Sequence, residues 1–531
     1  MFFSDSRRLQ HLKVENCPKL TLPQGSISTE SHLQSLEIKN VRHVEFQAES
    51  ISISRLRELV ISDSAIITFH QHSFKASLVD TPTVTVSIKN AQKAVLKPKA
   101  FAGLKSFTVE DVEELKLEHN AFKLRVPTAE PEINLTFVNI SMTSLASNVF
   151  PSSFKSVAIV NSRVDKIHVN AFSGLYMTNI TLDGVSINRI ERGAFSDNTA
   201  IGLLKFNHCN ISSLSQKSVV AGVTKFILTN SVIQSISKHG AINATTATVE
   251  IVNNRFRTLG QESFQFVSWD SVIIHNNTFE FLEQGSLNAI KGPSEDQDAY
   301  FSLTDNFIGY ANFKSLVTQI PMRVKLNVSG NSFGHTCDCK MENYVKSITG
   351  HSSLSSPFQD LTSMIQNTSR CKLSEQEKPC FESVSALLLN DYSKVLCKVG
   401  QELPECARVV EEDEDEETTE IINQKVGGGE VDRVPVGENN STTTFYDEFI
   451  LLFQVKTTKG ILLFLLFCVL SSVITVTICV GSVWVHRYFL PQLRVKNSRW
   501  RMGNFCPSSL HTQVRHAIQH SKQIQRVYSL D

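Results

Sequence analysis

One repeated pattern of apolar residues constrains the fold of this chain more than any other feature. An apolar residue, any residue and a second apolar residue recur at intervals of 21–29 residues between residues 7 and 334. Apolar residues at every second position indicate a short strand with one buried face. About 14 such units predict a solenoid, because no unit of this size can bury its apolar face without its neighbours. Taking the first apolar residue of each triplet as its anchor, the units begin at Leu12, Leu36, Leu59, Val86, Phe107, Leu135, Val157, Ile180, Leu204, Phe226, Val249, Val272, Phe301 and Leu326.

Three further positions of the unit support this alignment. Ten residues after the anchor the residue is nearly always apolar. Fifteen residues after the anchor phenylalanine recurs, which accounts for part of the total of 33 Phe, and we expect these rings in the core. Five residues after the anchor the last four units carry asparagine, whose side chain can bond the backbone of neighbouring coils. The phenylalanines are Phe74, Phe101, Phe122, Phe150, Phe172, Phe195 and Phe264, and the asparagines are Asn254, Asn277, Asn306 and Asn331.

The pattern resembles that of the extracellular leucine-rich repeat family, whose units read L-x-x-L-x-L-x-x-N/C-x-L. The stretches VTKFILTNSVIQSI, ATVEIVNNRFRTLGQESF and TNITLDGVSINRIERGAF show the match. The resemblance implies an α/β-type solenoid, a horseshoe with short parallel strands on its concave face. Val, Ile and Phe often replace the strand leucines, and a right-handed parallel β-helix also uses strands of the form V-x-I-x-x-N. The recurring phenylalanine favours leucine-rich repeats.

Six cysteines follow the last unit and predict a cap over residues 335–406, since the final coil of a solenoid needs cover. The cap resembles the cysteine-rich C-terminal flank of the same family. A C-x-C pair followed by gaps of 31, 8, 16 and 8 residues lacks the paired spacing of a zinc site. We therefore predict disulfides, with no metal and no cofactor, and 15 connectivities leave the pairing open. The disulfide candidates are Cys337, Cys339, Cys371, Cys380, Cys397 and Cys406.

A stretch of 26 residues without a charge, residues 460–485, predicts a transmembrane helix. At about 1.5 Å per residue it crosses a hydrocarbon core of about 30 Å. An acidic flexible stalk is predicted before it, at 407–459, and a short basic tail after it, at 486–531. The basic residues of the tail place it in the cytoplasm, so we predict a single-pass protein of the plasma membrane with an extracellular N-terminal part. Such a protein needs a signal peptide, and the repeats begin almost at Met1, so we expect the true N-terminus to be missing from this sequence.

Sequons for N-glycosylation occur only before the predicted span. None occurs before Asn134, so glycans would leave the first five units of the concave face bare. We predict that charged residues of these units bind a partner. The glycosylation candidates are Asn134, Asn139, Asn179, Asn210, Asn243, Asn276, Asn327, Asn367, Asn439 and Asn440, and the partner-binding candidates are Lys13, Glu15, Glu37, Lys39, Asp63, Lys89, Glu110 and Asp111.

The balance of 52 Lys+Arg against 52 Asp+Glu argues against binding of nucleic acid through bulk charge. The favoured function is recognition of an extracellular or cell-surface protein, possibly a second copy of this chain, by an adhesion molecule, receptor or co-receptor without enzymatic activity. The alternative is a membrane-tethered polysaccharide lyase or hydrolase on a parallel β-helix, which needs converging acid and base groups. Of the outward carboxylates only Glu110 and Asp111 are adjacent, and neighbours on a strand point to opposite sides.

Overall fold

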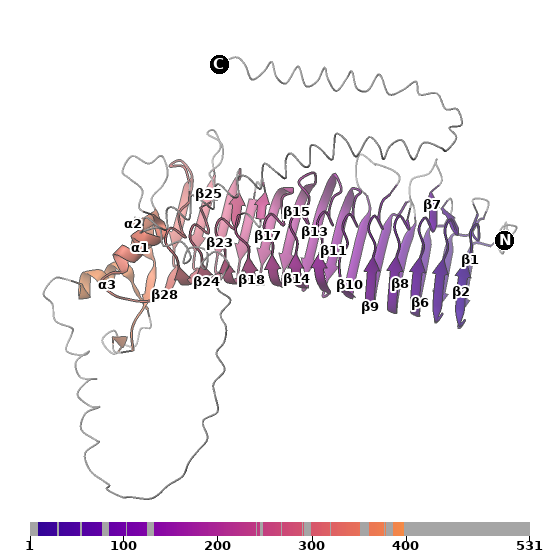
Figure 1. Ribbon diagram of the computed structural model, residues 1–531, viewed down its shortest axis with the longest axis horizontal. Helices are drawn as coiled ribbons and strands as arrows, with labels where there is room; N and C mark the ends of the chain where they lie inside the picture. The colour runs from indigo at the N-terminus through magenta and orange to yellow at the C-terminus, as the bar shows by residue number, and fades with distance from the viewer. Residues whose placement is uncertain are drawn as a thin grey trace, which may run out of the picture. The chain divides into compact units, whose positions relative to one another are not determined.

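The computed structural model describes residues 9–397, except 29–30, 54–55, 77–83, 102, 125–131, 240–241, 245–247, 267, 289, 291–298, 319, 351–360, 376 and 379–385. This part of the chain is a parallel β-solenoid followed by a small cap, and its strands lie side by side in one row after another (Figure 1). We number the coils 1–14 by their anchors and name the rows of strands the first, second and third faces.

The first face contains the strand that carries each anchor. Thirteen consecutive parallel pairings place all fourteen anchors opposite one another, from Leu12 opposite Leu36 to Phe301 opposite Leu326, so the predicted alignment of the repeats is confirmed. Its strands are β1 (His11–Glu15), β3 (Ser35–Lys39), β6 (Glu58–Phe69), β8 (Thr85–Leu96), β9 (Ser106–Leu117), β10 (Asn134–Met142), β11 (Phe154–Val160), β13 (Tyr176–Asp183), β15 (Ala200–Asn207), β17 (Gly222–Thr229), β20 (Thr248–Val252), β23 (Ser271–His275), β25 (Tyr300–Thr304) and β27 (Lys325–Ser329).

The second and third faces complete each coil. The second face holds β2 (Lys19–Leu22), β4 (His43–Phe46), the second halves of β6, β8 and β9, then β12 (Arg163–Ile167), β14 (Ser186–Ile190), β16 (Asn210–Leu214), β18 (Val232–Ile236), β21 (Arg255–Leu259), β24 (Thr278–Leu282), β26 (Phe307–Ala311) and β28 (Ser332–Thr336). The third face is made of isolated bridges and the short strands β5 (Ile51–Ile53), β7 (Phe74–Ala76), β19 (Ile242–Ala244) and β22 (Phe264–Phe266).

The solenoid differs from the predicted α/β-type in one respect. Between β1 and β28 the described residues form strands, bridges and turns but no α-helix. Each coil consists mainly of two strands and the corners between them. The β-branched and aromatic residues at its inward positions favour strands.

Two left-handed corners recur in coils 1–13 and bend the chain between its faces, and coil 14 has the first of them. Every described non-glycine residue with positive φ lies four or thirteen residues after an anchor. Asparagine and aspartate dominate the first corner because their short polar side chains tolerate this conformation. The first-corner residues are Asn16, Asn40, Asp63, Asn90, Asp111, Asn139, Asn161, Gly184, His208, Asn230, Asn253, Asn276, Asp305 and Gly330.

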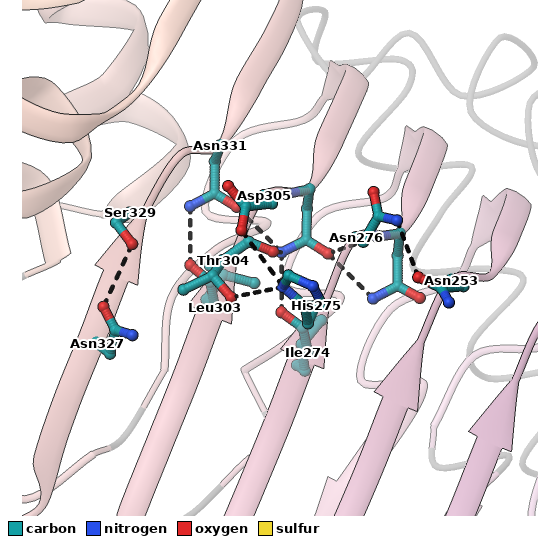
Figure 2. A network of polar contacts seen from close by, with 12 residues as sticks. Asn253, Ile274, His275, Asn276, Leu303, Thr304, Asp305, Asn327, Ser329 and Asn331 are labelled. Atoms are coloured by element: carbon teal, nitrogen blue, oxygen red, sulfur yellow. Dashed lines mark hydrogen bonds and ion pairs between the residues drawn. The ribbon is translucent and has the colours of Figure 1, made fainter.

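A ladder of buried asparagines links the last coils, as the sequence predicted. The backbone N–H of Asn254 donates to Oδ1 of Asn277 at 2.9 Å, and that of Asn277 donates to Oδ1 of Asn306 at 3.0 Å. Asn277 Nδ2 donates to the carbonyl of Ile251 at 2.8 Å. Figure 2 shows the end of the ladder, where Asn331 Nδ2 donates to the Leu303 carbonyl at 2.9 Å. Each side chain thus satisfies polar groups of the neighbouring coil.

Six of the recurring phenylalanines, from Phe74 to Phe195, form a continuous stack inside the solenoid, and Phe264 is buried farther along, which confirms their predicted place in the core. Phe122, Phe150, Phe172 and Phe195 are fully buried. The centroids of successive rings lie 5.6, 5.1 and 4.6 Å apart. Offset contacts at such distances stabilise a core beyond the burial of area alone.

The inward pattern of the second face changes between coils 5 and 6. In coils 2–5 the first inward residue of this face lies eight residues after the anchor, as in Val44, Ile67 and Leu115, and from coil 6 it lies seven residues after, as in Met142 and Val164. Leu20 of coil 1 lies at the same place and pairs with Val44. Strands run through the first corner without a break in coils 3–6, as β6, β8, β9 and β10. Coils 1–5 are therefore distinguished from the later coils by the inward position of their second face.

The cap packs on the last coil and is held by disulfides. It consists of α1 (Met341–Thr349), α2 (Leu361–Thr368), β29 (Arg370–Lys372), β30 (Ala386–Leu388) and α3 (Leu389–Leu396), and β29 pairs with β28. The disulfides join Cys337 to Cys371 and Cys339 to Cys397. Cys380 and Cys406 lie outside the described residues. The predicted disulfide bonding is thus confirmed for four of the six candidates.

No helix in the described part of the chain has the length and apolar composition to cross a membrane. The predicted span at 460–485, the stalk at 407–459 and the tail at 486–531 all lie outside the described residues.

The asparagine ladder gives a prediction about stability. In the full chain, Asn277→Ala leaves the Asn254 N–H and the Ile251 carbonyl without partners in the core, and each such group costs about 1–3 kcal/mol. We expect the free energy of unfolding, measured by urea titration, to fall by at least about 2 kcal/mol. Asn188→Ala removes an exposed asparagine of β14 and should change it by less than about 0.5 kcal/mol. Equal effects of the two substitutions would contradict a stabilising role for the ladder.

Candidate functional site

The charged residues predicted to bind a partner lie mainly in two rows across the first face of coils 1–5. One row, one residue after the anchor, places Lys13 opposite Glu37. The other row, three residues after the anchor, crosses β1, β3, β6, β8 and β9. Paired residues on adjacent strands lie about 4.8 Å apart, so each row is a continuous strip. The second row is Glu15, Lys39, Ser62, Lys89 and Glu110.

Most charges of these rows are paired with each other. Lys13 Nζ lies 2.6 Å from a Glu15 carboxylate oxygen and 3.5 Å from one of Glu37. Lys89 Nζ lies 2.8 Å from a Glu110 oxygen. The hydrogen bonds that Lys13 donates to Glu15 and Lys89 donates to Glu110 raise the pKa of each lysine above its ordinary value. Exposed pairs of this kind contribute little to stability, so their charges remain available to a partner.

Lys39 differs from the other lysines of the two rows. It is exposed and stands between Glu15 and Ser62 in the second row. Among the described residues it has no ion-pair partner. Among the lysines of the two rows, Lys39 is therefore the one that is open to a carboxylate from outside.

Asp63 and Asp111 do not point outward from a strand, where the sequence pattern had placed them. Both have a φ of 54° and belong to the left-handed first corner. Asn90 Nδ2 donates to Asp63 at 3.0 Å, and Asn139 Nδ2 donates to Asp111 at 2.6 Å. Their carboxylates thus join a ladder of side chains along the corner, beside the two charged rows.

The sequons of the described residues begin at the boundary between the two segments of the solenoid. Asn134 is the first residue of β10 in coil 6, and Asn179 follows on the same face in coil 8. Asn139 and Asn276 lie at the first corner, and Asn327 lies on β27, all three exposed. Asn210 is on the second face, Asn367 is in the cap and Asn243 is in β19. Asn439 and Asn440 lie outside the described residues.

A groove along the first corner was missed by the sequence analysis. Its volume is about 740 Å³, and its lining includes Asn40, Arg42, Asp63, Asn90 and Gln92 from coils 2–4. A column of Asn and Asp four residues after each anchor was the signal that could have revealed it, because it marks a polar corner repeated along the stack. The groove extends the polar surface beside the charged rows.

The sequence offers five outward carboxylates for the enzymatic alternative, and only two of them share a coil. They are Asp63, Glu110, Asp111, Asp183 and Asp305, of which Glu110 and Asp111 lie on coil 5. Asp183 accepts a hydrogen bond from Asn207 Nδ2 at 2.8 Å and lies 3.6 Å from His208 Nδ1. Asp305 lies 3.4 Å from His275 Nδ1, as Figure 2 shows. In the described residues each of these carboxylates has a neighbouring coil's polar group as its partner rather than a second carboxylate.

Comparisons with known proteins leave the family of the chain open. No protein-family model matches the sequence, and no curated protein matches it. Among solved structures, it is similar to the crystal structure of a complex of TLR13 with ssRNA13, at 12% sequence identity and a TM-score of 0.18. The match covers 69% of this chain and 77% of that one. A TM-score of this size carries no argument about fold or function.

Cys17 and Cys209 stand five residues after their anchors, where the last four coils carry asparagine. They allow a test of how the core is packed. Cys209 is buried, and burial raises the pKa of its thiol to about 11. Cys17, in the first coil, is only partly buried. Neither forms a disulfide. Because the thiolate is the reactive species, a raised pKa leaves Cys209 protonated and inert at pH 8.

We expect iodoacetamide to alkylate Cys17 in the native protein at pH 8 and to modify Cys209 only after denaturation. Peptide mass spectrometry measures both sites in one sample, so Cys17 serves as the internal control. Alkylation of both at the same rate in the native protein would contradict the described packing of coil 9.

Proposed function

We propose that the chain is a cell-surface protein of the leucine-rich repeat type that binds a protein partner through the first face of coils 1–5. In this proposal the first face is the concave surface of the solenoid, residues 460–485 cross the plasma membrane, and the tail is cytoplasmic. The protein acts as an adhesion molecule, receptor or co-receptor and carries no catalytic activity of its own.

The proposal rests on one observation. The coils without sequons are also the coils whose second face has a different inward position from that of the later coils. Coils 1–5 share the inward pattern of the second face and carry the two charged rows. The sequons begin at Asn134, the first residue of the next coil, and recur on or beside the same face at Asn139, Asn179, Asn276 and Asn327. Glycans at these positions cover the face from coil 6 onward and leave coils 1–5 accessible.

The charge pattern of the rows favours a protein ligand with charges of both signs. Acidic and basic side chains alternate along the second row, from Glu15 to Lys39 and from Lys89 to Glu110. Complementary charges across an interface fix its register and raise the association rate. A partner that brings a carboxylate to Lys39 gains an attraction that no described residue of this chain offers.

The first step of the test is to find the partner. Full-length protein displayed on cells is probed with a panel of soluble extracellular proteins, which includes this chain's own residues 7–406 fused to a detection tag. Saturable binding of one panel protein supports the proposal. Absence of saturable binding across the panel, together with release of oligosaccharides from an acidic polysaccharide incubated with the same cells, would overturn it in favour of the enzyme.

The second step locates the surface. Lys39→Glu removes one attraction and adds one repulsion, each worth up to about 1 kcal/mol at an exposed site, so we expect the dissociation constant of the identified partner to rise roughly tenfold. Lys325→Glu makes the same charge change at an exposed position of the first face in coil 14 and should leave it unchanged. Titrations on cells with matched surface expression measure both. An equal effect of the two substitutions would place the interface elsewhere.

A further inference from the structure

A second candidate binding site lies at the second corner of coils 7–9, away from the first face. It is a cleft of about 760 Å³ between the second and third faces. Three basic residues, Arg189, Arg192 and Lys217, contribute to its lining. Arg189 is an outward residue of β14, and Arg192 follows it on the same coil. Lys217 lies at the left-handed second corner of the next coil, with a φ of 51°.

One of the two carboxylates that line this cleft is already paired with other side chains. Glu191 lies 2.8 Å from Lys166 Nζ and 3.0 Å from His168 Nδ1, both on the preceding coil. The hydrogen bond from Lys166 is the main cause that holds the pKa of Glu191 below the ordinary value of a glutamate. Glu191 therefore stays ionised, and its charge is compensated by Lys166 rather than by the arginines of the cleft.

The three basic residues themselves remain without a carboxylate. Arg189 Nε donates to the Ser215 hydroxyl at 3.3 Å, which leaves its charge uncompensated. Among the described residues no Asp or Glu lies within ion-pair distance of Arg189, Arg192 or Lys217. Asp197 in the same lining carries one negative charge, so the three basic residues leave a net positive charge that attracts an anion.

We propose that this cleft binds a segment of an acidic polysaccharide, with sulfate or carboxylate groups on Arg189, Arg192 and Lys217. Guanidinium groups bind both kinds of anion in a bidentate manner, and lysine adds a point charge. Asn170 and Ser215 in the lining provide hydrogen-bond partners for sugar hydroxyls, and Asp197 accepts from them. Val169, whose exposed fraction is 44%, offers an apolar contact to the face of a sugar ring.

The composition of the lining separates a polysaccharide from other polyanions. None of the described residues that line the cleft is aromatic, so the bases of a single-stranded nucleic acid find no stacking partner there. A chain of glutamate or aspartate has no side-chain hydroxyl to donate to Asp197, which is exposed in the lining and repels its carboxylates. A sugar chain instead presents hydroxyl donors to Asp197 between its anionic groups.

The test compares two triple variants of the full-length protein that remove the same number of positive charges. The site variant is Arg189→Gln, Arg192→Gln and Lys217→Gln. The control variant is Lys155→Gln, Arg257→Gln and Lys325→Gln, which neutralises three exposed residues outside the cleft. Both keep the basic residues of 486–531, so any contribution of the tail to polyanion binding is equal in the two proteins. Unchanged melting temperatures show that both variants fold.

Binding to immobilised heparin, a sulfated polysaccharide, is measured by surface plasmon resonance at several salt concentrations. We expect the site variant to bind about tenfold more weakly and the control within about twofold of the unmodified protein, since each exposed charge contributes up to about 1 kcal/mol. The affinity of the unmodified protein should fall as salt screens the charges.

Soluble competitors separate the sources of the anion. Heparin oligosaccharides should displace the protein at concentrations that leave inorganic sulfate and poly-glutamate ineffective. Equal losses in the two triple variants would show binding by bulk charge and overturn the proposal. Displacement by inorganic sulfate at the same concentration would show a site for isolated anions, and displacement by poly-glutamate would show a peptide site, and each of these results also overturns it.

Discussion

The hydrogen bond from the backbone of one coil to the inward side chain of the next joins every pair of neighbouring coils from coil 9 to coil 14. It is made by asparagine in the last coils, but the same bond joins the Ile140 N–H to Ser162 Oγ at 3.1 Å and the Cys209 N–H to Ser231 Oγ at 3.0 Å. A serine or an asparagine at this position therefore has the same role, because either side chain supplies an oxygen that accepts from a buried backbone N–H. The asparagine column that looks irregular in the sequence is chemically more continuous in the structure.

The inward half of the molecule could be predicted from the sequence because burial is energetically large and periodic. Each anchor, each phenylalanine of the core and each of the four ladder asparagines contributes to a repeated pattern, and burying an apolar side chain is worth about 1.5–3 kcal/mol. A position that is buried in every coil therefore carries the same kind of residue at a regular interval along the sequence. The cap could be predicted in outline, because six cysteines directly after a solenoid indicate a disulfide-bonded cap without further structural information.

The outward half could be predicted only in part, because its interactions are weak and specific to neighbours brought together by the fold. Nothing in the sequence indicates that Lys13 contacts Glu37 rather than Glu15 alone, or that Asp63 turns into a left-handed corner to accept from Asn90. The cleft around Arg189 requires residues of three coils at the same corner. Which cysteines pair was equally hidden, since Cys337–Cys371 and Cys339–Cys397 depend on how the cap helices pack.

A solenoid keeps surfaces on different coils independent of each other. Each coil contacts chiefly its neighbours, so a substitution in coil 8 has no direct packing route to coil 2. The charged rows lie on the first face of coils 1–5, whereas the basic cleft lies at the second corner of coils 7–9. The proposed protein recognition and the proposed anion binding can therefore be gained or lost separately in this fold. The two activities become coupled only through a ligand long enough to reach both surfaces, and such coupling depends on the length of the ligand rather than on a conformational change.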